Sequence, residues 1–142
     1  MFPDSVIDPR TIQAYLETEY RVHGPSGFTL RVGEASAELL AAHARHQVEC
    51  SAYLTACNPF SRPTGDAENA TRQAALVAAV ERMGLVHEAG IGQHPSNEWP
   101  GEESVLIHGL SLEAASELAT RFEQNGFVWS GPDATPRLIL LR

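Results

Sequence analysis

The chain has 142 residues, of which 43% are hydrophobic and 20% are charged, proportions typical of a single globular domain. Its formal net charge is −8, and because no lysine occurs, all ten basic residues are arginine. This composition excludes catalysis by a lysine of this chain, and the acidic balance disfavours nonspecific binding to nucleic acid.

The first fifty residues predict a helix, a strand and a second helix. Asp8 and Pro9 are typical of a helix N-cap and a first helical position, so we expect a helix from there to Gly24-Pro25. Residues 28–32 predict a short strand, and the alanine- and leucine-rich residues 34–47 predict a helix. These elements would form an N-terminal helix-strand-helix extension.

From residue 51 onward, the hydrophobic pattern predicts five strands and two helices. The first helix should run from its N-cap Asp66 to Met83, and the second from Ser111 to a stop at Gly126. The apolar residues 138–141 do not alternate with polar ones, so both faces of the last strand should be covered. The strands are expected at residues 51–57, 85–89, 104–108, 127–130 and 137–141.

This order of elements is β-α-β-β-α-β with a final hairpin strand, which is the order of a ferredoxin-like split-βαβ core. We therefore expect an α/β (α+β) fold and a single domain over residues 1–142. In that domain, residues 1–50 form the extension and pack on a core of residues 51–142.

Three polar segments of such a fold meet at one rim of the sheet: the loop 58–65, the loop 90–103 and the end of the last helix. The helix N-terminus at Asp66 lies beside them and favours an anion. Independent loops have no need to share a rim, so their convergence points to a binding site. The expected ligand-binding residues are Asn58, Ser61, Arg62, Asn69, His94, Trp99, Gln124 and Asn125.

The same residues also suit ordinary structural roles, because Asn-Pro and Asn-Gly steps commonly form turns and helix ends. The leading hypothesis is a binding module for a small anionic or amide-bearing ligand, or for a short peptide, at this rim. One alternative is a hydrolase or transferase that uses Cys57, Ser61 or His94, with the pKa of the Cys57 thiol lowered by the nearby helix N-terminus. Another is an assembly protein that forms a homodimer through its C-terminal strand.

The remaining candidates for chemistry are weaker. His43, His46 and Cys50 have spacings that can hold zinc, but no fourth ligand is evident, so we expect a solvated helix face and neither a metal nor a cofactor. Glu102 and Glu103 are adjacent and should point apart, whereas a pair of catalytic carboxylates must converge.

The N-terminal sequence and the cysteines bear on cellular location. The start, MFPDSVIDPR, lacks the basic segment and apolar run of a secretory signal, and no apolar stretch approaches membrane-spanning length. The two cysteines, Cys50 and Cys57, are expected to be free thiols. We therefore expect a cytoplasmic protein that binds neither membranes nor nucleic acid.

Three stretches of sequence together resemble a known family. They are TACNPFSRPTGDAENATRQ at residues 55–73, ESVLIHGLS at residues 103–111 and FEQNGFVW at residues 122–129. They are similar to a bacterial family catalogued only as domain-of-unknown-function family 3293, most specifically in the Thr-Ala-x-Asn-Pro-x-Ser signature and the later Gln-Asn pair. Because the family has no assigned activity, the resemblance implies no reaction, cofactor or catalytic residue.

Overall fold

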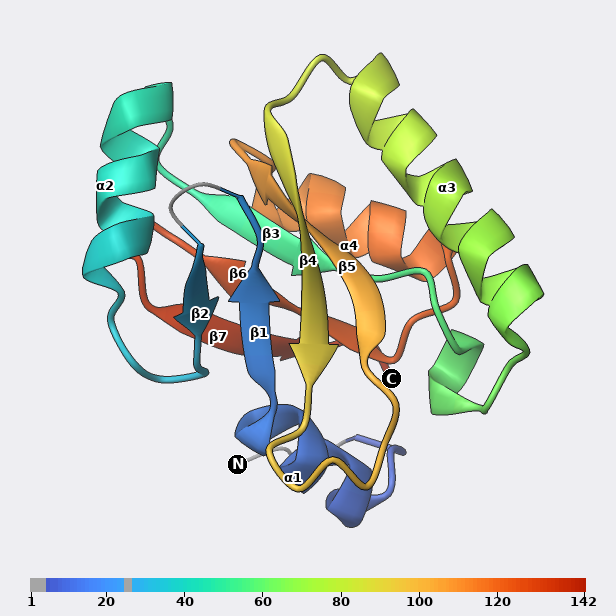
Figure 1. Cartoon of the computed structure of the whole chain (residues 1–142). Coiled ribbons are helices and arrows are strands. Elements are labelled where there is room, and N and C mark those ends of the chain that lie inside the picture. The colour runs from blue at the N-terminus through green and yellow to red at the C-terminus, as the bar shows by residue number, and fades with distance from the viewer. Residues whose placement is uncertain (1–4, 25–26) are drawn as a thin grey trace.

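The computed structural model describes residues 5–24 and 27–142 and has a mixed α+β fold. Within these residues, four α-helices pack on a curled, seven-stranded antiparallel sheet (Figure 1). The expected α+β class is confirmed. None of the helices in this part of the chain is long and apolar enough to cross a membrane.

The elements divide between an N-terminal third and the remainder of the chain. The N-terminal third supplies α1 (Pro9–Glu17), β1 (Glu19–Val22), β2 (Phe28–Leu30) and α2 (Ala37–His46). The remainder supplies β3 (Ser51–Leu54), a single 3-10 turn η1 (Pro59–Ser61), α3 (Asp66–Arg82), β4 (His87–Gln93), β5 (Glu102–His108), α4 (Leu112–Arg121), β6 (Gly126–Ser130) and β7 (Pro136–Leu140).

The sheet order is β2-β1-β4-β5-β3-β6-β7, and every neighbouring pair is antiparallel. The central strand β3 is buried along its whole length. Its residues alternate between two hydrophobic clusters, because successive side chains of a strand point to opposite faces. Ala52 and Leu54 face α3 and α4, whereas Tyr53 faces the cluster beneath α2.

The helices cover both faces of the sheet. Leu76 of α3 and Leu118 of α4 pack on one face, and Leu39 of α2 packs on the other. The shorter helix α1 packs through Ile12 against Leu138 of β7. It lies at the end of the sheet where β4 turns into β5 (Figure 1). This position of α1 shapes the candidate site.

The N-terminal extension differs from its prediction. The N-cap is as expected, because Asp8 accepts the Arg10 N–H at 2.8 Å, but the helix ends at Glu17 and residues 19–22 form strand β1. The expected stop at Gly24 therefore follows a strand, and Pro25 lies outside the described residues. Because β1 and β2 join the same sheet as the core, the extension is helix-strand-strand-helix, with its strands built into the core's sheet.

The β4–β5 hairpin is also longer in its strands than predicted. The expected loop 90–103 shrinks to residues 94–101, because β4 continues to Gln93 and β5 begins at Glu102. Gly90 lies within β4 rather than in a loop. Its small size is required by packing, since a Cβ atom there would collide with the Arg21 carbonyl oxygen of β1.

Helix α4 does not end at a glycine. Gly126 was expected to end this helix in the left-handed conformation, but it is instead the first residue of β6. The left-handed residue is Glu123, with φ of 59°, which follows the C-cap Phe122. The helix therefore ends earlier than predicted, and Gln124 and Asn125 are left in the connection to β6.

Strand β7 forms one edge of the sheet, and its apolar run is covered on both faces by this same chain. Leu138 and Leu140 lie in the cluster with α1, whereas Ile139 and Leu141 pack against the cluster beneath α3 and α4. The lack of alternation in this strand therefore needs no second subunit to explain it.

Candidate functional site

A cleft of about 790 Å³ opens beside α1, at the end of the sheet where β4 turns into β5. Arg62 is not among its lining residues, and its guanidinium instead lies 5.9 Å from the centre of the Phe60 ring. The other seven residues expected from the sequence line the cleft: Asn58, Ser61, Asn69, His94, Trp99, Gln124 and Asn125.

The loop between β3 and α3 has an unusual backbone that its own side chains hold in place. Asn58, Phe60 and Ser61 have φ angles of 47°, 54° and 60°, a left-handed region that is strained for residues other than glycine. The Asn58 side chain accepts the backbone N–H of Thr64 and an amide N–H of Asn69, each at 2.9 Å. Asn69 returns the contact by accepting the Asn58 N–H at 2.9 Å.

Glu102, the first residue of β5, places a carboxyl group in the cleft. Asn58 Nδ2 donates to its Oε2 at 2.7 Å, and its Oε1 accepts no hydrogen bond within the described residues. Burial raises the pKa of Glu102, and the hydrogen bond from Asn58 opposes this effect only in part. Tyr20 and Tyr53 also line the cleft, and their hydroxyls donate to backbone carbonyl oxygens. Glu102 therefore has one carboxyl oxygen that can accept a hydrogen bond from a ligand, and the aromatic side chains of Tyr20 and Tyr53 line the same cleft.

A hydrogen-bond network ties α1 to the β3–α3 loop and to β6. The Tyr15 hydroxyl bonds to the Ser61 hydroxyl, and Asn125 Nδ2 donates to Tyr15 at 3.0 Å. Arg142 donates to Asn125 Oδ1 at 3.1 Å. Because both ends of the Asn125 amide are engaged, this side chain positions α1 along the cleft.

His94 links the hairpin loop to α1. The Ser96 N–H donates to His94 Nδ1 at 3.2 Å, so the proton lies on Nε2, which donates to Glu17 Oε1 at 2.9 Å. The bond from His94 holds the pKa of Glu17 below its usual value. Trp99 meets the His94 ring edge-on, with ring centres 4.7 Å apart, and remains 51% exposed. Trp99 is thus an aromatic surface that a ligand can reach.

Gln124 and Cys57 are buried residues of the lining. Gln124 Nε2 donates to the carbonyl oxygens of Cys57 at 3.1 Å and Phe122 at 3.2 Å, and its Oε1 accepts no hydrogen bond in the part of the chain that the structure describes. The Cys57 thiol was expected to have a lowered pKa. This expectation is wrong, because burial raises the pKa of the thiol more than neighbouring hydrogen bonds lower it.

The polar groups that remain available in the cleft are mainly hydrogen-bond acceptors. Besides Glu102 and Gln124, the lining includes the exposed carboxylates of Asp66 and Glu103. Asp66 was expected to be the N-cap of α3, but it is the first helical residue after Gly65. Its own carboxylate therefore lies at the helix N-terminus and competes there with any external anion. The lining favours a ligand that donates hydrogen bonds.

Several lining residues were not identified from the sequence. Tyr15 and Tyr20 both fall within the helix that was expected from Asp8-Pro9 to Gly24, because their spacing from Ile12 is approximately helical. The missed signal is the two-residue spacing of Tyr20 and Val22, which favours a strand. Once β1 is a strand, α1 becomes a short helix that folds back along the cleft.

The residues with zinc-like spacing in the sequence do not converge. The His43 ring bonds to the Ser51 hydroxyl at 2.9 Å, and the Cys50 thiol donates to the Leu110 carbonyl oxygen at 3.3 Å. His46 is separate from both and lies against His108, with ring centres 4.6 Å apart. Spacing along a helix gave no information about this contact, because His108 comes from a distant strand.

Comparison with known proteins gives one match. No curated protein and no solved structure matches the chain. The sequence profile of the family described as "Protein of unknown function (DUF3293)" matches residues 54–126, which include the loop with Asn58 and Ser61, Glu102 and the Gln124-Asn125 pair. The resemblance drawn from the sequence is confirmed, and the chain belongs to the DUF3293 family.

Proposed function

We propose that this chain is a binding module whose cleft takes a small amide-bearing ligand or the end of a short peptide. The observation that carries the proposal is Glu102, a partly buried carboxyl group with one oxygen that accepts no hydrogen bond from the described residues, in a cleft that also exposes Trp99. A ligand N–H group can donate to this oxygen while its flat amide packs on the indole.

The size of the cleft supports this proposal. Its volume of about 790 Å³ lies within the range of roughly 300–1,000 Å³ that is usual for small-molecule sites. Such sites combine apolar and aromatic walls with few directed polar groups. Here the side chains of Asn58, Asn69 and Asn125 are engaged in hydrogen bonds within the protein and hold the cleft in shape. Glu102 and Gln124 are therefore left to contact the ligand.

The charge of the cleft favours an amide over an anion. The expected anion site relied on Arg62, whose guanidinium lies against Phe60 outside the lining. A carboxylate ligand would also meet Glu102, Glu103 and Asp66, and like charges in a confined site repel. The lining also contains Arg10, which is paired with Asp8 at 3.4 Å.

The order of the core elements supports the expectation of a ferredoxin-like split-βαβ core. Strands β4-β5-β3-β6 are neighbours in that order, with α3 and α4 packed on one face, as in a ferredoxin-like split-βαβ unit. We propose this topology for the core, with β7 and the β1–β2 pair extending it at its two edges. The free thiols of Cys50 and Cys57 suit a reducing, cytoplasmic environment.

The two tryptophans allow a direct test by NMR. Trp99 lines the cleft, whereas Trp129 Nε1 donates to the Leu110 carbonyl oxygen at 3.0 Å, away from it. The ¹⁵N-labelled chain is titrated with a panel of dipeptide amides and with the same dipeptides as free acids. We expect saturable shifts of the Trp99 indole signal with amides, weaker binding of the acids by tenfold or more, and a stationary Trp129 signal.

Matched variants of two glutamates provide the control. Glu102→Ala should weaken amide binding about tenfold or more, because it removes the acceptor. Glu113→Ala, at an exposed position of α4 outside the cleft lining, should change it little. The proposal fails if no amide shifts the Trp99 signal, or if the free acids bind more tightly than the amides.

An enzyme at the same rim is the second candidate, and one contact favours it. The Ser96 hydroxyl lies 2.8 Å from His94 Nδ1, opposite the bond from Nε2 to Glu17, which gives a hydroxyl, imidazole and carboxylate in a row. Cys57 and Ser61 are less suitable, since the thiol is buried and the Ser61 hydroxyl is bonded to Tyr15. A fluorophosphonate probe that labels the wild-type chain but not Ser96→Ala would support hydrolysis. If the probe labels neither the wild-type chain nor Ser96→Ala, a serine hydrolase at this rim is ruled out.

A further inference from the structure

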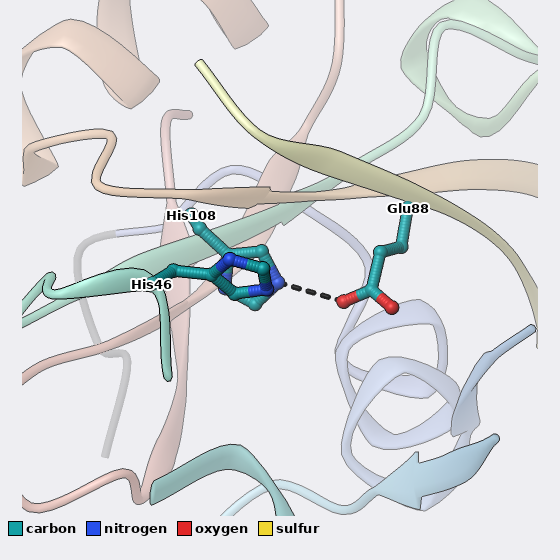
Figure 2. A group of neighbouring side chains, drawn as sticks. All are labelled: His46, Glu88 and His108. Carbon is teal, nitrogen blue, oxygen red and sulfur yellow. Dashed lines mark hydrogen bonds and ion pairs between the residues drawn. The ribbon is translucent and has the colours of Figure 1, made fainter. Parts of the chain in front are cut away.

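A second group of polar side chains lies at the opposite end of β5 from Glu102. His46, Glu88 and His108 point toward one another, with Glu88 hydrogen-bonded to His108 (Figure 2). Glu102 and His108 are the first and last residues of β5, so the two sites are separated by roughly 20 Å, at about 3.3 Å per residue. This group has no part in the proposed cleft.

The fold brings these three residues together from three elements. Glu88 of β4 pairs with Leu106 of β5, so His108, two residues further along, lies on the same face of the sheet. That face is covered by α2, whose last residue is His46. The contact thus joins the C-terminal end of α2 to two neighbouring strands.

The geometry of the group resembles a metal coordination sphere. His108 Nε2 lies 2.7 Å from Glu88 Oε2, and one ligand atom from each of the three side chains lies within 4.8 Å of the others. Zinc bonds of about 2.0–2.2 Å place ligand atoms roughly 3–3.5 Å apart. Small side-chain rotations are therefore enough to bring all three onto one ion.

The His108 ring gives a second, independent indication. Its side chain is fully buried, and its Nδ1 has no hydrogen-bond partner within the described residues. A buried polar atom without a partner is uncommon and calls for an explanation. Because the Glu88 carboxylate accepts from Nε2 at 2.7 Å, the ring proton lies on Nε2 when no metal is bound, and a metal ion at Nε2 would shift that proton to the unpartnered Nδ1.

We propose that His46, Glu88 and His108 bind a divalent transition-metal ion of the Zn²⁺ class. Two imidazoles and one carboxylate are a common zinc ligand set, and three protein ligands leave the fourth tetrahedral position for water or an exogenous group. His46 and Glu88 are only partly buried, which gives the ion a route from solvent. The bound ion would cross-link the C-terminal end of α2 to β4 and β5.

Zinc titration of the full-length chain tests this site. Isothermal calorimetry with ZnCl₂, and competition with a chromophoric zinc chelator, should give one tight site per chain. His46→Ala should weaken it at least tenfold, because His46 is partly exposed and its loss removes a ligand without opening the core. Glu88→Gln should weaken it similarly. Co²⁺ loaded in place of zinc should show the visible absorption of a four-coordinate ion.

The control is His87→Ala, which removes the histidine next to Glu88 on the opposite face of β4 and should leave zinc affinity unchanged. A thermal scan adds a readout that does not depend on a spectroscopic probe. Zinc should raise the Tm of the wild-type and His87→Ala chains but not that of His46→Ala. Failure to bind zinc, or binding that survives both His46→Ala and Glu88→Gln, overturns the proposal.

Discussion

The strained backbone of the β3–α3 loop depends on one asparagine side chain. Asn58 adopts a left-handed φ of 47° and bonds to Thr64, Asn69 and Glu102. Asparagine tolerates this backbone region better than most residues, and its amide is what links the loop to α3 and β5. Asn58 therefore sets both the shape of the loop and the position of the free Glu102 oxygen.

Replacing Asn58 by glycine separates the backbone effect from the side-chain effect. Asn58→Gly keeps the left-handed conformation but removes the hydrogen bonds, so it should lower the free energy of unfolding by about 2–3 kcal/mol. Asn97→Gly is the matched control, because Asn97 is also left-handed, at φ of 59°, but exposed in the hairpin loop; it should change stability by less than about 0.5 kcal/mol. Urea unfolding measures the stability of both variants. Equal losses of stability in the two would contradict the role assigned to the Asn58 side chain.

The raised pKa of Glu102 predicts a pH dependence of stability. The folded chain keeps this proton at a pH at which the unfolded chain has lost it, so the stability it contributes is present at low pH and is lost as the pH rises through the folded-state pKa. Glu102→Gln cannot ionise and should have a Tm a few degrees above the wild type at pH 8, with the difference vanishing near pH 4. Glu103→Gln changes an exposed neighbour and should have the same Tm as the wild type across the pH range. A Tm difference between Glu102→Gln and the wild type that does not change with pH would contradict this reasoning.

At the scale of elements, the β1–β4 contact requires a residue without a side chain. A Cβ atom at Gly90 would meet the Arg21 carbonyl oxygen and lie 2.7 Å from the Tyr53 hydroxyl, which itself donates to that carbonyl at 2.6 Å. At Gly92, two residues along on the same face, the nearest atom would be 3.7 Å away, an ordinary contact. The two glycines of one strand therefore have different roles.

Alanine substitutions at these two glycines should differ in their effect. Gly90→Ala must displace β1 or Tyr53 and should destabilise the chain by about 2–3 kcal/mol, the usual magnitude for overpacking. Gly92→Ala should change the free energy of unfolding by less than about 1 kcal/mol, since no atom has to move. Denaturant unfolding of the pair measures this, and similar losses would show that the approach of β1 to Gly90 is not as close as described.

The elements that the sequence predicted well are those with a local signal. Asp8 and Ser111 act as the expected N-caps, and the buried positions of α3 and α4 follow a helical period. The errors occur where distant contacts decide. Residues 90–93 look like a loop because of two glycines, but β1 pairs with them and makes them a strand. No local signal shows that pairing.

The candidate site was predictable in part for the same reason. Asn58, Trp99 and Asn125 stand out because they are polar or aromatic residues in loops, and the expected strand order places those loops together. The roles of α1 and Glu102 were not predictable, because they depend on where β1 joins the sheet and where β5 begins. The contact of His46 with His108 was likewise out of reach, since it joins a helix to a strand sixty residues away.

At the scale of the whole molecule, the C-terminal strand needs no partner to cover its faces. Because α1 and the α3–α4 cluster already cover the apolar side chains of β7 at least in part, and Arg137 of this edge strand is exposed, we expect the chain to be a monomer. Light scattering coupled to size exclusion at micromolar concentration should give the mass of one chain. A stable dimer that Arg137→Glu dissociates would contradict this expectation.

The central claim is that the cleft beside α1 binds an amide through Glu102. A crystal structure of the chain grown with the tightest-binding dipeptide amide tests it most directly. We predict electron density for the ligand beside Trp99, with an amide nitrogen at hydrogen-bond distance from Glu102 Oε1, about 2.7–3.2 Å. Density for the ligand at another surface, with the cleft empty, would contradict the claim.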